Sequence, residues 1–343
     1  MSTSTNRMPL IDALRAVAAL LVMFNHFSIY GPMSDTVWDE FPDTFEWFCD
    51  YGGMAVQVFL VIGGFLAVRG MSPTGQGHAT SPLPLIWKRY LRLVVPYLAA
   101  IVLAVAAAAF VDQWIDHDAI PDRPTVTQML AHVFLLQGVL GFDSLSAGLW
   151  YVAIDFQLFA ATALVLRLGR VGSALVLLLA VVSLFGFNLN DDWDNWALYF
   201  FGSYGLGAAA WWASNPRVKP RWLAVIALVT FGALWLEFRE RIAIALVVAL
   251  LLGLSRPTGF LEGSGHFAPV AFLGKISYSL FLVHFPVLLA ANGIYAMLGL
   301  SSLASAEVGL MFACVASIGF AALFHGWIEK PSLRLTREAR RAA

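Results

Sequence analysis

The chain has 343 residues, of which 59% are apolar and 13% are charged, and its formal net charge is −1. Ordinary soluble domains contain roughly 45–50% apolar and about 25% charged residues. So little polar surface argues against a soluble enzyme, a disordered protein and a nucleic-acid-binding protein. The two cysteines, Cys49 in a polar connection and Cys314 in an apolar run, support neither a disulfide framework nor a metal site. We therefore expect the lipid bilayer to be the solvent.

Ten segments are apolar enough to be expected as membrane-spanning helices, since a span needs about 20 mostly apolar residues. They cover residues 8–30, 52–70, 85–111, 148–167, 171–187, 195–213, 221–236, 241–255, 271–297 and 305–327. The first segment carries Asp12 and Arg15 and is followed by no small-residue cleavage pattern, which favours a retained helix over a signal peptide. The predicted fold is all-α: a polytopic membrane helix bundle forming one domain over residues 1–343, with no attached soluble domain.

The sign of the charges alternates between successive connections, and only the seventh, with Arg239 and Arg241 beside Glu237 and Glu240, is ambiguous. Basic residues collect in the even-numbered connections and in the C-terminal tail: Arg69, Lys88, Arg89, Arg92, Arg167, Arg170, Arg217, Lys219, Arg221, Arg256, Lys330, Arg334, Arg337, Arg340 and Arg341. Acidic residues dominate the first, third and fifth connections: Asp35, Asp39, Glu40, Asp43, Glu46, Asp50, Asp112, Asp116, Asp118, Asp122, Asp143, Asp191, Asp192 and Asp194. Because lysine and arginine are enriched in cytoplasmic loops, both termini are predicted to be cytoplasmic. The long connections 31–51 and 112–147 are then expected as outer loops.

The first predicted helix contains a line of polar side chains. An ionisable group at mid-bilayer costs about 2.5–3.5 kcal/mol on insertion scales, so each one is a functional candidate. Arg15 and His26 are eleven residues apart, almost three helical turns, which places them on one face about 16 Å apart along the axis. Asp12 shares this face one turn below Arg15. The alternatives are that Asp12 and Arg15 only anchor the helix end and that His26 is a hydrogen-bonded structural histidine.

Two further ionisable side chains fall inside predicted helices. Asp155 lies about 10 Å from the outer end of segment 148–167, where His26 is its expected partner by depth. A carboxylate that orients an imidazole suits a general base, and the alternative is a structural bond to another helix. His284 precedes Pro286, which removes a backbone hydrogen bond and frees a carbonyl group. His284 is therefore either catalytic or a buried histidine that satisfies the kinked backbone.

Two arginines at the start of segment 85–111 form a candidate anion site. Arg89 and Arg92 lie on adjacent turns of one helix face, where guanidinium groups could pair with the phosphates of a cofactor entering from the cytoplasm. The alternative is that they only fix the topology. Near the C-terminus, a packing role is favoured for Glu329, with pairing to Arg15, Arg89 or Arg92 as the alternative.

Six motifs follow one another along nearly the whole chain. They are Ile11-Asp12-Ala13-Leu14-Arg15 with His26, Val58 to Leu66, Arg89-x-x-Arg92, Leu149-Trp150 to Gln157, Ile276-Ser277-Tyr278-Ser279-Leu280 to Pro286, and Ile328-Glu329-Lys330-Pro331. Each is weak alone, but the ordered set resembles the acyltransferase-3 family of integral-membrane acyltransferases. Proteins of that family modify sugars of bacterial surface polysaccharides and some other acceptors.

The resemblance implies ten helices in the bacterial inner membrane and an acyl-CoA donor, usually acetyl-CoA, taken from the cytoplasm. It implies transfer to a hydroxyl or, less often, an amine. The family's functional positions map to Arg15, His26, Arg89 and Arg92. The chain departs from the family at Tyr151 and Asp155, where serine and glutamate are common, and at Gly63, where serine is common. The shorter Asp155 leaves its partner open.

Geometry and resemblance combine into one hypothesis, O-acetylation of a cell-envelope polysaccharide or another acceptor. Arg89 and Arg92, together with Arg15, would hold the phosphates of acyl-CoA, while His26, Asp155 and His284 form the catalytic set. Asp12, Tyr278 and Glu329 are assigned structural roles, and no metal is expected. A transporter or flippase of a lipid-linked sugar is the competing function, although no matching repeat halves are visible. A scaffold without chemistry is disfavoured by the cost of burying these ionisable groups.

Overall fold

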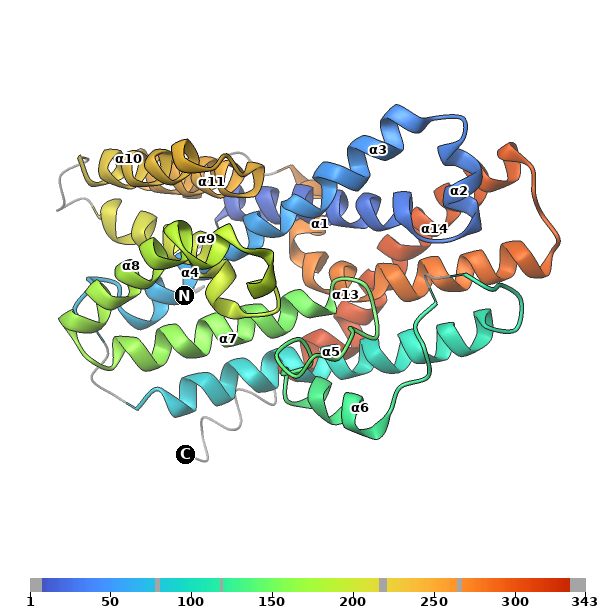
Figure 1. Ribbon diagram of the computed structural model, residues 1–343, viewed down its shortest axis with the longest axis horizontal. Coiled ribbons are helices and arrows are strands. Elements are labelled where there is room, and N and C mark those ends of the chain that lie inside the picture. The colour runs from blue at the N-terminus through green and yellow to red at the C-terminus, as the bar shows by residue number, and fades with distance from the viewer. Residues whose placement is uncertain (1–7, 78–80, 118–119, 216–220, 264–266, 334–343) are drawn as a thin grey trace, which may run out of the picture. The chain divides into compact units, whose positions relative to one another are not determined.

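The computed structural model describes residues 8–77, 81–117, 120–215, 221–263 and 267–333. These residues form helices joined by turns and contain no strand, which confirms the all-α class (Figure 1). Several charges used above to predict orientation lie outside the described residues: Asp118, Arg217, Lys219, Arg334, Arg337, Arg340 and Arg341.

A helix overlaps each of the ten predicted ranges. These helices are α1 (Pro9–Ile29), α4 (Val56–Met71), α5 (Leu83–Val111), α7 (Leu149–Leu166), α8 (Arg170–Phe185), α9 (Ala197–Ala213), α10 (Arg221–Leu236), α11 (Glu240–Ser255), α13 (Ala268–Met297) and α14 (Leu303–Phe324). Among the described residues, seven helical stretches are long and apolar enough to cross a membrane. The helices α9, α10 and α11 are shorter, with 17, 16 and 16 residues. Ten crossings and cytoplasmic termini stay predictions.

The two long connections expected as loops are partly helical. The first contains α2 (Pro32–Trp38) and α3 (Pro42–Tyr51), and the second contains α6 (Val126–Val133). Both α2 and α3 begin at a proline, whose fixed φ and missing N–H group suit the first helical turn. The α6 helix begins after Thr125, whose hydroxyl accepts a hydrogen bond from the backbone of Gln128. Short elements complete the list: α12 (Phe260–Gly263), 3-10 turns at Gly52–Ala55, Phe187–Leu189 and Asp191–Trp193, and a π-helical turn at His325–Glu329.

The chain divides into two compact units. The first contains residues 1–18, 56–87 and 154–275, and the second contains residues 19–55, 88–153 and 276–343. Within the first unit, α9 packs against α4, α8 and α11. Within the second, α14 packs against α2. The single domain expected over residues 1–343 stays a prediction.

Two glycines allow α4 and α9 to approach closely in the first unit. A Cβ atom on Gly64 would overlap a backbone carbonyl group of α9, and one on Gly207 would overlap a backbone carbonyl group of α4. Lipid tails provide no hydrophobic drive for helix association, so close packing through small residues stabilises such pairs. The same two helices share a hydrogen bond of 2.6 Å from the Ser203 hydroxyl to Gln57 Oε1. Contacts with α9 thus anchor α4.

Gly64→Ala is expected to lower the free energy of unfolding by about 1–3 kcal/mol, because the added methyl group forces the two helices apart. Gly70→Ala on the same helix is the matched control, since nothing lies within 4 Å of the position of its Cβ atom. Thermal unfolding of both variants in one detergent measures the difference. Equal midpoints for the two variants would contradict the close approach of α4 and α9.

Candidate active site

The second unit brings two buried histidines into direct contact. His26 lies near the C-terminal end of α1 and is 8% exposed, and His284 lies on α13 and is fully buried. The Nδ1 atom of His26 is 2.6 Å from the Nε2 atom of His284. The two rings are stacked, with centroids 4.9 Å apart and planes within 11°. The structure therefore joins two residues that the sequence presents as separate candidates.

Hydrogen bonds assign the tautomer of both rings. His284 Nδ1 lies 2.8 Å from the carbonyl oxygen of Leu280. A carbonyl oxygen can only accept, so this nitrogen carries the proton. Neutral His284 then has its lone pair on Nε2, which accepts the Nδ1–H of His26. It follows that neutral His26 has its own lone pair on Nε2, and an imidazole oriented in this way has the form that a general base requires.

Aromatic rings and one glycine surround the pair. The ring of Tyr30 lies 5.6 Å from that of His26, and the ring of Phe281 lies 6.3 Å from that of His284. A Cβ atom on Gly148 would lie 3.6 Å from His26 Cε1 and 3.0 Å from Phe281. Gly148 also has φ = +84°, a left-handed conformation that favours glycine. The edge of His26 between its two nitrogens thus faces backbone without a side chain.

Asp155 of α7 belongs to the first unit and is 4% exposed. A Cβ atom on Gly63 would lie 3.1 Å from the carboxylate of Asp155 and 3.1 Å from the ring of Tyr204. The absence of a side chain at Gly63 therefore makes room for the carboxylate beside α4. The pairing of Asp155 with His26 stays a prediction.

The candidate phosphate-binding arginines lie on two helices. Arg15 is half-buried on α1, which runs without interruption from Pro9 to Ile29. Its spacing of about 16 Å along the axis from His26 stays a prediction. On α5, Arg89 is half-buried and Arg92 is exposed. The hydroxyl of Tyr278 donates a hydrogen bond of 3.1 Å to the carbonyl oxygen of Leu93, next to Arg92. Tyr278 thus ties α13 to the part of α5 that carries both arginines.

Glu329 has other partners than the arginines suggested by the sequence. Its buried carboxylate accepts a hydrogen bond of 2.5 Å from the Ser279 hydroxyl and lies 2.9 Å from Nδ1 of His325. The π-helical turn from His325 to Glu329 directs both side chains to one side. Glu329 therefore ties the end of α14 to α13. At the other end of α13, Gly274 packs against the backbone of half-buried Asp12.

The comparison with known families covers almost the entire chain. A model of the acyltransferase-3 family, described as an acyltransferase domain, matches residues 9–326. The matched range contains both histidines of the pair, Asp155 and the three candidate arginines. No curated protein and no solved structure matches the chain.

Neutral His26 is expected to be protonated on Nδ1 and unprotonated on Nε2. The measurement is ¹⁵N NMR of full-length protein labelled at histidine, recorded at alkaline pH, where imidazoles are neutral. A His26→Gln variant assigns the two resonances among those of the seven histidines. A proton found on His26 Nε2 instead would contradict the assigned hydrogen-bond chain.

Proposed function

Because the chain belongs to the acyltransferase-3 family, we propose that it transfers an acyl group, expected to be acetyl, from cytoplasmic acyl-CoA to a hydroxyl group of a sugar or another acceptor. Family membership and the seven candidate spans found among the described residues support a membrane acyltransferase. The observation that carries the mechanism is the oriented pair of His26 and His284. We place the protein in a bacterial inner membrane as part of this proposal.

His26 acts as the general base in this mechanism. Its Nε2 lone pair takes the proton of the acceptor hydroxyl while the hydroxyl oxygen forms a bond to the thioester carbonyl carbon. The bond from that carbon to sulfur then breaks, and the proton passes from His26 to the CoA thiolate. General-base catalysis of this kind contributes typically 10²–10⁴-fold.

His284 positions the base and stabilises its charged form. Once His26 has taken the proton on Nε2, its ring is positively charged. Its Nδ1–H still donates a hydrogen bond to His284, which stabilises this charge. His284 can accept this hydrogen bond only because the carbonyl oxygen of Leu280 holds the proton of His284 on Nδ1. Asp155 remains a catalytic candidate, since a carboxylate that is 4% exposed in an apolar helix is costly to insert without a role.

The arginines are proposed to bind the donor. Acyl-CoA carries several phosphate charges, and a guanidinium group pairs with phosphate through two parallel hydrogen bonds. Arg89 and Arg92 on α5, with Arg15 on α1, provide three such groups. The axial offset of about 16 Å predicted between Arg15 and His26 is comparable to the reach of the pantetheine arm.

His26→Ala is expected to lower the rate of acyl transfer by 10²–10⁴-fold, since the proton acceptor is lost. His284→Gln should lower the rate less, because the base is retained but poorly oriented. The assay measures free CoA released by purified protein given acetyl-CoA and an acceptor, which a transporter would not produce. Unchanged thermal unfolding serves as the control for folding, and normal CoA release by His26→Ala would overturn the assignment.

Arg89→Gln and Arg92→Gln are each expected to raise KM for acetyl-CoA by about tenfold, the effect of one lost charged hydrogen bond. Lys88→Gln is the matched control, because exposed Lys88 carries the same charge in the same turn but on another face of α5. KM is measured at saturating acceptor for each variant. An equal rise in Lys88→Gln would show a general effect of charge and contradict a specific phosphate site.

A further inference from the structure

A cavity of about 720 Å³ lies in the second unit, beside the C-terminal end of α5 and the segment that follows it. Its volume lies within the range of about 300–1,000 Å³ that is typical of small-molecule sites. Five polar residues line it: Asp112, Asp116, His117, Asp122 and Arg123. The three aspartates are exposed to solvent, so the cavity is reached from water.

The charge of the lining indicates the class of ligand. Three carboxylates face one guanidinium group, and the pair of Arg123 and Asp112 is loose, 3.7 Å apart with both side chains exposed. Such a lining repels phosphates, which excludes the CoA part of the donor. Carboxylates only accept hydrogen bonds, so they suit a ligand rich in hydroxyl donors. Within the part of the chain that the structure describes, no three acidic, histidine or cysteine side chains are grouped to share a metal ion.

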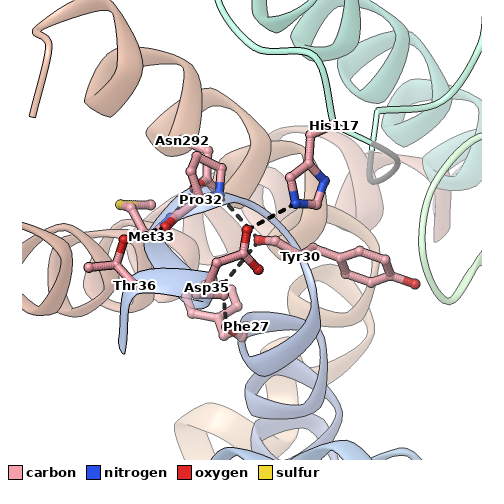
Figure 2. A network of polar contacts seen from close by, with 9 residues as sticks. Phe27, Tyr30, Pro32, Met33, Asp35, Thr36, His117 and Asn292 are labelled. Atoms are coloured by element: carbon pink, nitrogen blue, oxygen red, sulfur yellow. Dashed lines mark hydrogen bonds and ion pairs between the residues drawn. The ribbon is translucent and has the colours of Figure 1, made fainter. Parts of the chain in front are cut away.

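One wall of the cavity is tied to the corner between α1 and α2. His117 Nε2 lies 3.3 Å from Oδ2 of Asp35, as Figure 2 shows. Asn292 of α13 fixes the same corner, since its side chain accepts a hydrogen bond from the backbone of Met33 and donates one to the carbonyl oxygen of Tyr30. The wall is therefore attached to the helix that carries the proposed base.

A short stretch of backbone leads from the cavity to His26. Leu145 lines the cavity, and Gly148 three residues later faces the His26 ring. Between them Ser146 is 1% exposed, and its hydroxyl has no hydrogen-bond partner among the described residues. A buried polar group of this kind requires a partner such as water or a ligand.

A second line of contacts reaches the same histidine. Ile115 and Ile120 line the cavity and pack against a buried cluster that includes Phe285. Tyr30 packs against this cluster too, with its ring 5.2 Å from that of Phe285 and 5.6 Å from that of His26. One layer of packed side chains thus lies between the cavity and the base.

We propose that this cavity is the acceptor subsite and that it binds a neutral, hydroxyl-rich sugar, whose carbons lie on Ile115 and Ile120 and whose hydroxyls donate to Asp116 and Asp122. Delivery of one hydroxyl toward His26 rests on the proposed acyl transfer. Binding of the sugar does not, so the two are tested separately.

The binding experiment uses full-length protein in detergent and no donor. Saturation-transfer NMR is recorded with two neutral probes, maltose and diacetylchitobiose, and with an anionic probe, digalacturonate. At least one neutral probe should bind and digalacturonate should not. The double variant Asp116→Asn/Asp122→Asn should lose most of the signal, whereas Asp39→Asn, an exposed aspartate of the same unit outside the cavity, should keep it. Failure of both neutral probes, equal binding of digalacturonate or retained binding in the double variant would overturn the proposal.

The kinetic experiment applies the same variants to acyl transfer. The double variant should raise KM for the acceptor by about tenfold, with KM for acetyl-CoA and the rate at saturating acceptor unchanged. An equal effect of Asp39→Asn, or a change confined to KM for acetyl-CoA, would overturn the acceptor assignment. Sugar binding without any CoA release would support the cavity as a sugar site and count against the proposed function instead.

Discussion

The hydrogen bond from His284 to the carbonyl oxygen of Leu280 determines what His26 can do. A backbone carbonyl group cannot donate, so the proton of His284 is held on Nδ1 and its other nitrogen must accept. That acceptor in turn holds the proton of His26 on Nδ1 and leaves a lone pair on Nε2. The helix backbone thus fixes the tautomers of this pair, as a carboxylate fixes the tautomer of the histidine in a hydrolase triad. The proposed chemistry depends on the fixed donor-to-acceptor direction of these two hydrogen bonds.

Much of the fold follows from the lengths of the apolar runs, which is why a helix overlaps every predicted range. The helices α2, α3 and α6 were not expected, because their segments are too short to be detected as spans and only local signals mark them. Pro32, Pro42 and Thr125 provide those signals at the helix starts. Apolar content detects segments buried in lipid, whereas these helices depend on a proline or a capping residue at their start and on contacts such as that between α2 and α14.

The sequence identifies the individual candidate residues of the site, but it does not show which of them meet. Helical spacing places Arg15 and His26 on one face, yet it gives no information about which helix that face meets. His26 and His284 are 258 residues apart, and nothing in the helical spacing of either segment indicates that they meet. The partners of Glu329 show the same limit. A packing role was favoured for Glu329 with arginine pairing as the alternative, but the sequence did not identify Ser279 and His325, which the packing of the last turn brings to the carboxylate.

The acidic wall of the proposed acceptor cavity differs in kind from the histidine pair. Its carboxylates are exposed and stand on a connection after α5, so they contribute little to the stability of the helices. The fold therefore tolerates mutations there, and under the proposed acceptor assignment they change recognition. Gly148 permits almost no variation, because both its backbone conformation and its neighbours exclude a side chain. A lineage of such proteins can therefore diversify in what it modifies while retaining one catalytic apparatus.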